Sequence, residues 1–357
     1  MFANQLELFD RKISLTDPTY FIADIAANHD GSLQRAIDLI HLCAEAGADC
    51  AKFQHFTAST IVSDRGFTGE FSSVSHQKGW SKSVYEVYEQ YHTREEWDGE
   101  LIKECKAANI HFMTTPYNLD VVDRFVEYVP GFKIGSGDIT FSNIIEKVAA
   151  TKLPVFIATG ASTYDEVQEC VKMISSINQK ICLMQCNTNY TGSIENFKFV
   201  NLNVLKNYST AFPGIILGLS DHTPGHSAVL GAIALGARVI EKHFTDDNKR
   251  VGPDHKFALN PETWRDMVNS TRELEHALGD GQKRIEENEK ETVVIQRRSI
   301  RASKDISKGH TIQESDVISL RPAPPTSITP MHLSNVIGKK LLCDVKDGEY
   351  FKWENLE

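Results

Sequence analysis

The sequence has no long apolar run and no excess of positive charge. Nowhere in its 357 residues do 18 or more apolar residues follow one another, so no membrane-spanning helix is predicted. Residues 1–15 lack the basic start and long apolar core of a signal peptide. The 38 Lys and Arg residues are outnumbered by 48 Asp and Glu residues, which gives a net charge of −10. Such acidity disfavours non-specific binding to nucleic acid, and we expect a cytoplasmic protein that binds neither nucleic acid nor membranes.

The cysteines form no Cys-x-x-Cys pair, although the chain contains seven of them. A scattered, odd-numbered set is typical of reduced thiols in a cytoplasmic protein, where Cys serves mostly as a small core residue. Cys186 is the exception to watch, because it stands at the end of a candidate strand.

Short apolar runs alternate with longer amphipathic segments from about residue 18 to residue 278. Buried parallel strands read as continuous apolar runs, because helices cover both faces of their sheet. Eight such units predict a (β/α)₈ TIM barrel. A doubly wound open sheet is the alternative, which the absence of a Gly-x-Gly-x-x-Gly motif after the first strand disfavours. The expected strands are 20–25, 50–54, 110–114, 132–135, 155–159, 181–186, 215–220 and 238–243.

Helices are predicted between these strands, for example over 32–46, 163–177 and 228–235. Apolar residues recur at helical spacing in each of them. For the first helix, either Asp30 or Ser32 could provide the N-terminal cap.

The pattern changes after the last of the eight units. Residues 279–291 are strongly charged, and the chain from Ser299 is richer in β-branched residues. It also contains Arg-Pro-Ala-Pro-Pro at 321–325, which is a poor helix or central-strand sequence. We therefore expect three parts: a barrel domain over 1–280, a linker over 281–298 and a small β-rich domain over 299–357.

The C-terminal part contains an internal echo. A motif of Asp, Gly and apolar residues that begins at Asp305 recurs, offset by 39 residues, at Asp344. Each copy predicts a strand, a Gly turn and a second short element. Two unrelated turns are the alternative to a pseudo-symmetric domain.

Functional side chains of a (β/α)₈ enzyme gather at the C-terminal ends of its strands, and those ends are chemically unusual here. Lys52 and Lys133 lie on short strands, where a buried ammonium group is costly unless it is paired. The turn at 135–137 is rich in Gly, and its N–H groups could approach an anion closely. With three hydroxyl side chains, these features predict a phosphate or carboxylate site formed by Lys52, Thr115, Lys133, Ser136 and Ser220.

His222 and His243 form a second constellation. They are 21 residues apart, one strand-to-strand unit, so they should end adjacent strands about 4.8 Å apart. Two imidazoles in that position predict a divalent metal site with open coordination positions, suited to Mn²⁺, Zn²⁺, Fe²⁺ or Co²⁺. Carboxylates are nearby in the pattern: Asp24, Asp138, Asp221 and Glu241.

Five strings of residues resemble the sialic acid synthase family: FIADIAANHDGSLQRA, AKFQ, FKIGSGD, LGLSDHTPGH and VIEKHFTDDNKRVGPDH. This family includes relatives that make legionaminic and pseudaminic acids and spore-coat polysaccharide precursors. The tail from Ser299 is similar to the family's antifreeze-like, or SAF, domain. The resemblance covers about residues 18 to 357 and implies a TIM barrel followed by a β-rich SAF domain.

The resemblance also implies a reaction. Family members condense phosphoenolpyruvate with an acylamino six-carbon sugar aldehyde and water, which gives a nine-carbon 2-keto-3-deoxy acid and phosphate. It implies a divalent metal, Mn²⁺ foremost, with Mg²⁺ or Co²⁺ as alternatives. It further implies a domain-swapped homodimer, in which the tail of one subunit closes the barrel mouth of the other.

Matching the family's positions residue by residue assigns roles to thirteen side chains. The metal ligands match His222 and His243, which together with Asp24 and Asp138 make the expected catalytic set. The phosphoenolpyruvate contacts match Lys52, Thr115, Lys133, Ser136 and Ser220. The sugar contacts match Gln54, Tyr190, Asp254 and, from the tail, Arg321.

Three departures from the family pattern bear on the substrate. The family usually has Glu where Asp24 and Asp138 stand, so both carboxylates are kept with a shorter reach. The motif at the end of the sixth strand is 186–189 (CNTN) instead of Cys-Thr followed by Ser or Asn, and the loop that includes Gly79 and Trp80 also differs. We expect the chemistry to survive, and these changes leave the identity of the sugar open.

The residues leave further choices open. Either Asp24 or Asp138 could orient or deprotonate the attacking water. A keto-acid-phosphate synthase that uses a phosphorylated aldehyde is one alternative function, which the SAF-like tail disfavours. A catalytically inactive sugar-binding homologue is the other, which the intact lysines and histidines disfavour. The cations that could bind a distal phosphate are Lys242, Lys249, Arg250 and Lys256.

Overall fold

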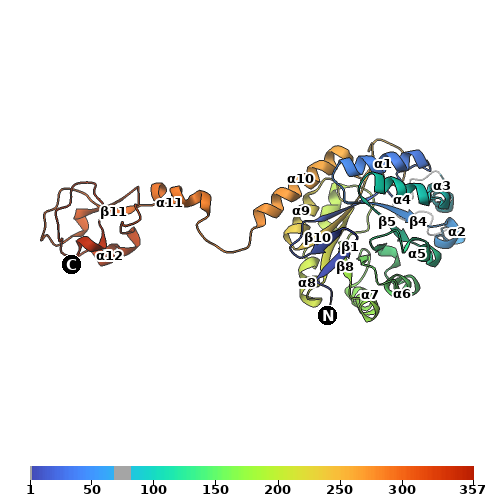
Figure 1. The fold of residues 1–357 in the computed structure, drawn as a ribbon, viewed down its shortest axis with the longest axis horizontal. Coiled ribbons are helices and arrows are strands. Elements are labelled where there is room, and N and C mark those ends of the chain that lie inside the picture. The colour runs from blue at the N-terminus through green and yellow to red at the C-terminus, as the bar shows by residue number, and fades with distance from the viewer. Residues whose placement is uncertain (1, 68–81) are drawn as a thin grey trace. The chain divides into compact units, whose positions relative to one another are not determined.

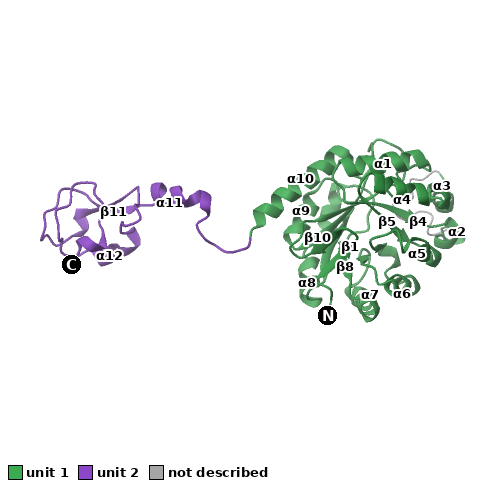
Figure 2. Cartoon of the chain, viewed as in Figure 1, with its two compact units in different colours: residues 1–279 green, residues 280–357 purple. Residues whose placement is uncertain are grey.

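The computed structural model describes residues 2–67 and 82–357. The chain forms two compact units, residues 1–279 and residues 280–357 (Figure 2). The loop positions Gly79 and Trp80, which bear on the sugar, lie outside the described residues. Within the described ranges, no helix has both the length and the apolar character needed to cross a membrane.

Unit 1 is a closed barrel of eight parallel strands with helices around it, which confirms the predicted TIM barrel (Figure 1). Every expected apolar run matches one strand to within two residues at either end, and nearly all the side chains in these strands are buried. Around the ring the strands are β3 (Tyr20–Asp24), β4 (Cys50–His55), β5 (His111–Pro116), β6 (Phe132–Ile134), β7 (Val155–Ala158), β8 (Ile181–Cys186), β9 (Ile216–Asp221) and β10 (Ala237–His243), which pairs with β3.

The helices begin at the polar residues that the sequence offers as caps. Ser32 caps the first of them, because its side chain accepts a hydrogen bond from the Arg35 N–H. Thr163 and Glu166 form a reciprocal capping box at the start of another. The helices of unit 1 are α1 (Leu33–Glu45), α2 (Ala58–Ile61), α3 (Val84–Tyr91), α4 (Asp98–Ala107), α5 (Leu119–Phe125), α6 (Ser142–Ala150), α7 (Tyr164–Ile177), α8 (Val204–Ala211), α9 (Ser227–Ala234) and α10 (Pro261–Leu278).

An N-terminal hairpin, which the sequence analysis did not anticipate, closes the lower end of the barrel. Its antiparallel strands are β1 (Gln5–Leu8) and β2 (Arg11–Ser14). Three of its apolar side chains are fully buried in a cluster with residues near the starts of the barrel strands. Those three are Leu6, Leu8 and Ile13.

Unit 2 is a small domain around one antiparallel pair, β11 (Ser299–Ala302) and β12 (Val317–Leu320). It also contains helices α11 (Lys290–Gln296) and α12 (Leu333–Val336). Helix α11 falls inside the segment expected to be a linker. Unit 2 has an apolar core of its own, which includes the fully buried Phe351.

The internal echo in this domain is confirmed as a structural repeat. The Asp305 carboxylate accepts a hydrogen bond from the Asp347 N–H at 2.9 Å, and the Asp344 carboxylate accepts one from the Lys308 N–H at 2.7 Å. Each Asp therefore caps the turn of the other copy. The Gly that follows each turn has a left-handed backbone, as only Gly adopts readily.

Candidate active site

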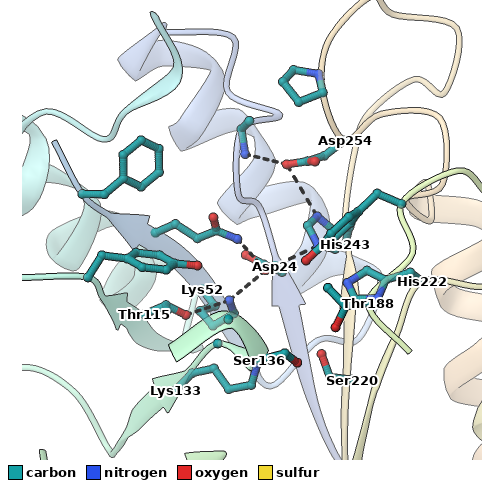
Figure 3. Close-up of a pocket in the computed structure, with 18 of the residues that line it drawn as sticks. Asp24, Lys52, Thr115, Lys133, Ser136, Thr188, Ser220, His222, His243 and Asp254 are labelled. Carbon is teal, nitrogen blue, oxygen red and sulfur yellow. Dashed lines mark hydrogen bonds and ion pairs between the residues drawn. The ribbon is translucent and has the colours of Figure 1, made fainter. Parts of the chain in front are cut away.

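The register of the barrel places the predicted residues side by side. Asp24 pairs with Lys52 on one neighbouring strand and with His243 on the other, and Ser220 pairs with Glu241. A cavity of about 350 Å³ opens at these strand ends, which is a usual size for a small-molecule site. Twelve of the thirteen predicted site residues line it: Asp24, Lys52, Gln54, Thr115, Lys133, Ser136, Asp138, Tyr190, Ser220, His222, His243 and Asp254. Figure 3 labels these residues except Gln54, Asp138 and Tyr190.

The two lysines lie at the floor of this cavity and are already paired with carboxylates. The Lys52 ammonium donates to Asp24 at 2.8 Å and to the Thr115 hydroxyl at 3.1 Å. The Lys133 ammonium donates to Glu241 at 2.8 Å. Both lysines are almost fully buried, and such pairing is what makes a buried ammonium tolerable.

Glu241, which the sequence pattern indicated only as a nearby carboxylate, contacts three other site residues. Besides Lys133, its Oε1 accepts the Ser220 hydroxyl at 3.1 Å and lies 3.9 Å from the Lys52 ammonium. Its Oε2 is buried and has no hydrogen-bond partner among the described residues. Side chains two apart in a strand share a face, so the inward position of His243 was a signal that Glu241 also points inward.

The two candidate catalytic carboxyl groups differ in their environment. Burial acts to raise the pKa of Asp24, but Lys52, His243 and Lys133 together hold that pKa below its usual value. Asp24 also accepts from the Gln54 amide at 3.1 Å. Asp138, in the short 3₁₀ turn Ser136–Asp138, has a pKa raised by burial to about 6. At neutral pH Asp24 is a fixed anion, whereas Asp138 is near its titration point.

The two histidines face each other with ring centroids 5.4 Å apart. The Nδ1 of His222 donates to the Asn187 carbonyl at 3.0 Å, which leaves the other ring nitrogen for a ligand. Burial lowers the pKa of His243 to about 3, so its imidazole is neutral. Its Nδ1 is buried without a hydrogen-bond partner among the described residues.

Burial acts to lower the pKa of His222, but its contacts with Cys186 and the Asn187 carbonyl raise that pKa above its usual value. Imidazole nitrogens in the neutral form are common ligands of divalent metals, so the His222 and His243 rings fit such an ion. Across the described ranges, no group of three or more His, Cys, Asp and Glu side chains is assembled as a metal cluster. The protein therefore offers two ready ligands, with carboxylates close by. Asp24 lies 3.7 Å from His243 Nε2, and Asp254 lies 3.8 Å from His243 Nδ1.

Gly160, which follows β7, permits the close approach of two hydroxyl side chains that line the cavity. Its N–H donates to the Ser136 hydroxyl at 2.9 Å. A Cβ at this position would lie 1.9 Å from the Thr188 hydroxyl and 2.9 Å from that of Ser136. Only Gly lets these two hydroxyl side chains converge on the cavity.

Aromatic rings form the upper wall of the cavity. Phe56 packs against Tyr88 of α3 and against Tyr117, with centroid distances of 5.2 and 5.9 Å. Tyr190 packs against His222 at 4.5 Å. Of these rings, only Tyr190 was expected in the site. Tyr88 comes from a helix and carries no strand-end signal, whereas Phe56 and Tyr117 directly follow β4 and β5 and could have been found by that signal.

Arg321 is the one predicted site residue that belongs to unit 2. It is exposed in unit 2, directly after β12. Its expected contact with a sugar stays a prediction. The four cations considered for a distal phosphate do not line the cavity: Lys242, Lys249, Arg250 and Lys256.

The family assignment follows from comparison with known proteins. A model described as the NeuB family matches residues 39–283, and a SAF domain model matches residues 297–357. The chain belongs to the NeuB family. Its core match covers most of the barrel that carries the cavity, and the SAF match covers the small β-rich domain.

Relatives of this NeuB-family chain make several different sugar acids. It is 34% identical to the N,N′-diacetyllegionaminic acid synthase of Legionella pneumophila, over 95% of this chain and 94% of the relative. It is 32% identical to the pseudaminic acid synthase of Campylobacter jejuni, over 93% and 95%. It is 31% identical to the human N-acetylneuraminate-9-phosphate synthase, over 93% and 91%.

Solved structures agree with this assignment. The spore coat polysaccharide biosynthesis protein SpsE of Bacillus subtilis superposes with a TM-score of 0.64 at 26% identity, over 99% of both chains. The sialic acid synthetase of Leptospira borgpetersenii, solved with citrate, gives a TM-score of 0.70 at 24% identity, over 82% of this chain and 96% of that one.

Proposed function

We propose that this chain condenses phosphoenolpyruvate with an acylamino six-carbon sugar aldehyde and water. The products would be a nine-carbon 2-keto-3-deoxy sugar acid and inorganic phosphate. One observation carries the proposal: two buried lysines and two facing histidines line a single cavity of about 350 Å³ at the C-terminal ends of the barrel strands. An anion site next to a metal site is what this reaction requires.

The lysine floor suits phosphoenolpyruvate. Lys52 and Lys133 are held by Asp24 and Glu241 before any substrate arrives, so their positions cost no reorganisation on binding. Hydroxyls of Thr115, Ser136 and Ser220 would complete the contacts to phosphate and carboxylate. Because the floor carries as many carboxylates as ammonium groups, a trianionic substrate would gain from an additional cation.

A divalent metal held by His222 and His243, with Mn²⁺ foremost and Mg²⁺ or Co²⁺ as alternatives, would supply that charge and Lewis-acid polarisation of the aldehyde oxygen. The enol carbon of phosphoenolpyruvate then attacks the aldehyde carbon. Water adds at C2 of the phosphoenolpyruvate unit, and the tetrahedral intermediate expels phosphate. Asp138 suits the removal of the water's proton, since its pKa of about 6 is near neutrality, while Asp24 orients Lys52 and Gln54.

The sugar would occupy the upper part of the cavity. Gln54, Tyr190 and Asp254 offer hydrogen bonds there, and the rings of Phe56, Tyr88 and Tyr117 offer an apolar wall for acyl methyl groups. Among the described lining residues, Lys52 and Lys133 are the cations. This favours an acceptor without a phosphate group over the phosphorylated-aldehyde alternative.

The direct test is turnover of purified protein with phosphoenolpyruvate and a panel of acylamino sugars, with and without Mn²⁺. We expect metal-dependent phosphate release together with a product whose mass equals a nine-carbon keto acid. Failure of every sugar to release phosphate in the presence of metal would support the inactive-homologue alternative instead.

The proposal extends to the assembly. A domain-swapped homodimer would bring Arg321 of one subunit to the sugar in the barrel of the other. The substrates are soluble metabolites, so a cytoplasmic location fits the reaction. Neither point is needed for the chemistry at the barrel floor.

A further inference from the structure

Two loops at the barrel mouth are tied together through one carboxylate. The first, 25–32, joins β3 to α1, and the second, 244–260, joins β10 to α10. We propose that Asp30 is a positioning residue, which holds the second loop so that Asp254 stays in the cavity. The inference rests on the proposed function in one respect, the assignment of Asp254 to the acceptor sugar.

Asp30 uses both carboxylate oxygens to hold the second loop. Its Oδ1 accepts from His255 Nε2 at 2.9 Å. Its Oδ2 accepts two bonds from the Arg250 guanidinium, at 3.0 and 2.8 Å. Arg35 of α1 lies 3.3 Å from the same oxygen and makes a two-pronged contact with Asp246 at 3.0 Å. Charge-assisted bonds of this kind are about twice as strong as neutral ones.

His255 is the next residue after Asp254 in the chain, so the bond from Asp30 to His255 also restrains the position of Asp254. The ring is fully buried, and its Nδ1 lies 2.7 Å from the Thr245 hydroxyl. Its backbone carbonyl accepts from the Asn248 amide at 2.9 Å. A Cβ at Gly252 would lie 2.7 Å from the ring, so the backbone of the second loop packs directly against His255 at this position.

The two loops meet a second time at Asp254 itself. Its Oδ2 accepts from the Ala27 N–H at 3.2 Å and lies 3.8 Å from His243 Nδ1 (Figure 3). Asp30 and Ala27 thus belong to one short loop that holds both Asp254 and its neighbour His255. Loss of the Asp30 contacts would free the segment that carries Asp254 while leaving the lysine floor intact.

Asp30→Asn separates charge from backbone geometry. Asp30 has a left-handed backbone, with φ at +52°, and Asn is among the residues that tolerate this conformation. The amide keeps the size of the side chain but leaves Arg35 and Arg250 without their shared counter-charge. The side chain does not line the cavity, so any effect on the acceptor must travel through other residues.

The experiment is a double-mutant cycle of Asp30→Asn and Asp254→Asn, measured with saturating Mn²⁺. We expect Asp30→Asn to lower kcat/KM for the acceptor by about 10- to 100-fold, as for other outer partners of site residues. The KM for phosphoenolpyruvate should change less than about threefold, because Lys52 and Lys133 are untouched. In the Asp254→Asn background, Asp30→Asn should add less than about threefold.

Asp38→Asn is the matched control, because Asp38 is exposed on α1. If Asp30→Asn folds poorly, Arg250→Gln removes one contact from the exposed rim and should give a smaller loss that also vanishes in the Asp254→Asn background. Equal losses with and without Asp254 would overturn the proposal, as would an unchanged acceptor kcat/KM in Asp30→Asn. Absence of turnover in the unmodified protein would instead contradict the proposed function.

Discussion

Lys133 and Glu241 meet at 2.8 Å although their strands stand four places apart in the eight-stranded ring. They therefore bridge the barrel from one side to the other at the floor of the cavity. Both are almost fully buried. The substrate floor is thus also a structural element, and its substitution should affect stability as well as catalysis.

Lys133→Met should leave Glu241 as an unpaired buried charge. Breaking a buried pair by removing one member costs about 3–5 kcal/mol, which urea unfolding would measure. Adding Glu241→Gln to Lys133→Met should restore part of that stability, because the unpaired charge is removed. A double variant no more stable than the single one would contradict this account of the bridge.

The same floor predicts a kinetic result. Lys52→Met and Lys133→Met should each lower kcat/KM for phosphoenolpyruvate by about 10²-fold or more, since charge-assisted contacts are lost in a recessed site. Lys103→Met is the control, because Lys103 is exposed on α4 and pairs with Glu100 and Glu104 of the same helix. Similar losses in all three variants would mean that the anion site lies elsewhere.

The facing histidines predict a metal requirement. His222→Ala or His243→Ala should abolish turnover while the circular dichroism spectrum stays unchanged, because both lie at strand ends and not in the apolar core. Chelation by EDTA should inactivate the protein, and Mn²⁺ should restore it. Titration of Mn²⁺ by electron paramagnetic resonance would report binding directly, and full activity after exhaustive chelation would exclude the site.

The two carboxyl groups predict different pH profiles. Asp138 is neutral below its pKa of about 6 and charged above it, so a proton-accepting role makes kcat/KM rise as pH increases through 6. Asp24 has a lowered pKa and stays charged over this range, which would give a flat profile. Asp138→Glu should retain activity and shift the midpoint, whereas Asp138→Asn should lose most activity.

The absence of cations around the upper cavity, among the described residues, predicts acceptor preference. An unphosphorylated acylamino sugar should exceed its phosphate ester in kcat/KM by about 10²-fold, because Asp138 and Asp254 would repel a phosphate that no lysine or arginine offsets. Competition between the two forms, followed by mass spectrometry of the products, measures the ratio directly. Preference for the ester would point to the phosphorylated-aldehyde alternative.

Arg321 allows a test of whether the C-terminal domain of one subunit serves the barrel of the other. If it serves the barrel of the other subunit, mixing Arg321→Ala with His222→Ala chains creates one barrel with both groups intact. Activity should then rise toward half that of the unmodified dimer, after mass spectrometry has verified exchange. No recovery despite proven exchange would place Arg321 in its own barrel or outside the reaction.

Much of the site could be predicted because strand period and barrel topology are both readable from the sequence. Lys52 and Lys133 lie on short apolar runs, the two histidines stand at strand ends, and parallel strands bring such positions together. Lys242 lies between Glu241 and His243, and it points away from the cavity to Asp221 at 2.6 Å, as alternation requires. These relationships depend only on local backbone geometry.

The contacts that could not be predicted from the sequence depend on distances across the barrel and between loops. The bridge from Lys133 to Glu241 requires the barrel's width and the lengths of both side chains. Tyr88 reaches the cavity from a helix whose position is set by packing. The bonds from Asp30 to the second loop join residues 220 and 225 positions apart, and no periodicity links such positions.

The N-terminal hairpin packs against residues near the starts of the barrel strands, so both substrates would enter from the opposite end, and this predicts the order in which they bind. Phosphoenolpyruvate would occupy the lysine floor, and the sugar would sit above it beneath Tyr190 and Asp254. A bound sugar then obstructs the path to the floor, so phosphoenolpyruvate must enter first. Steady-state kinetics should therefore show an ordered sequential mechanism, in which the acceptor does not bind productively to the free enzyme.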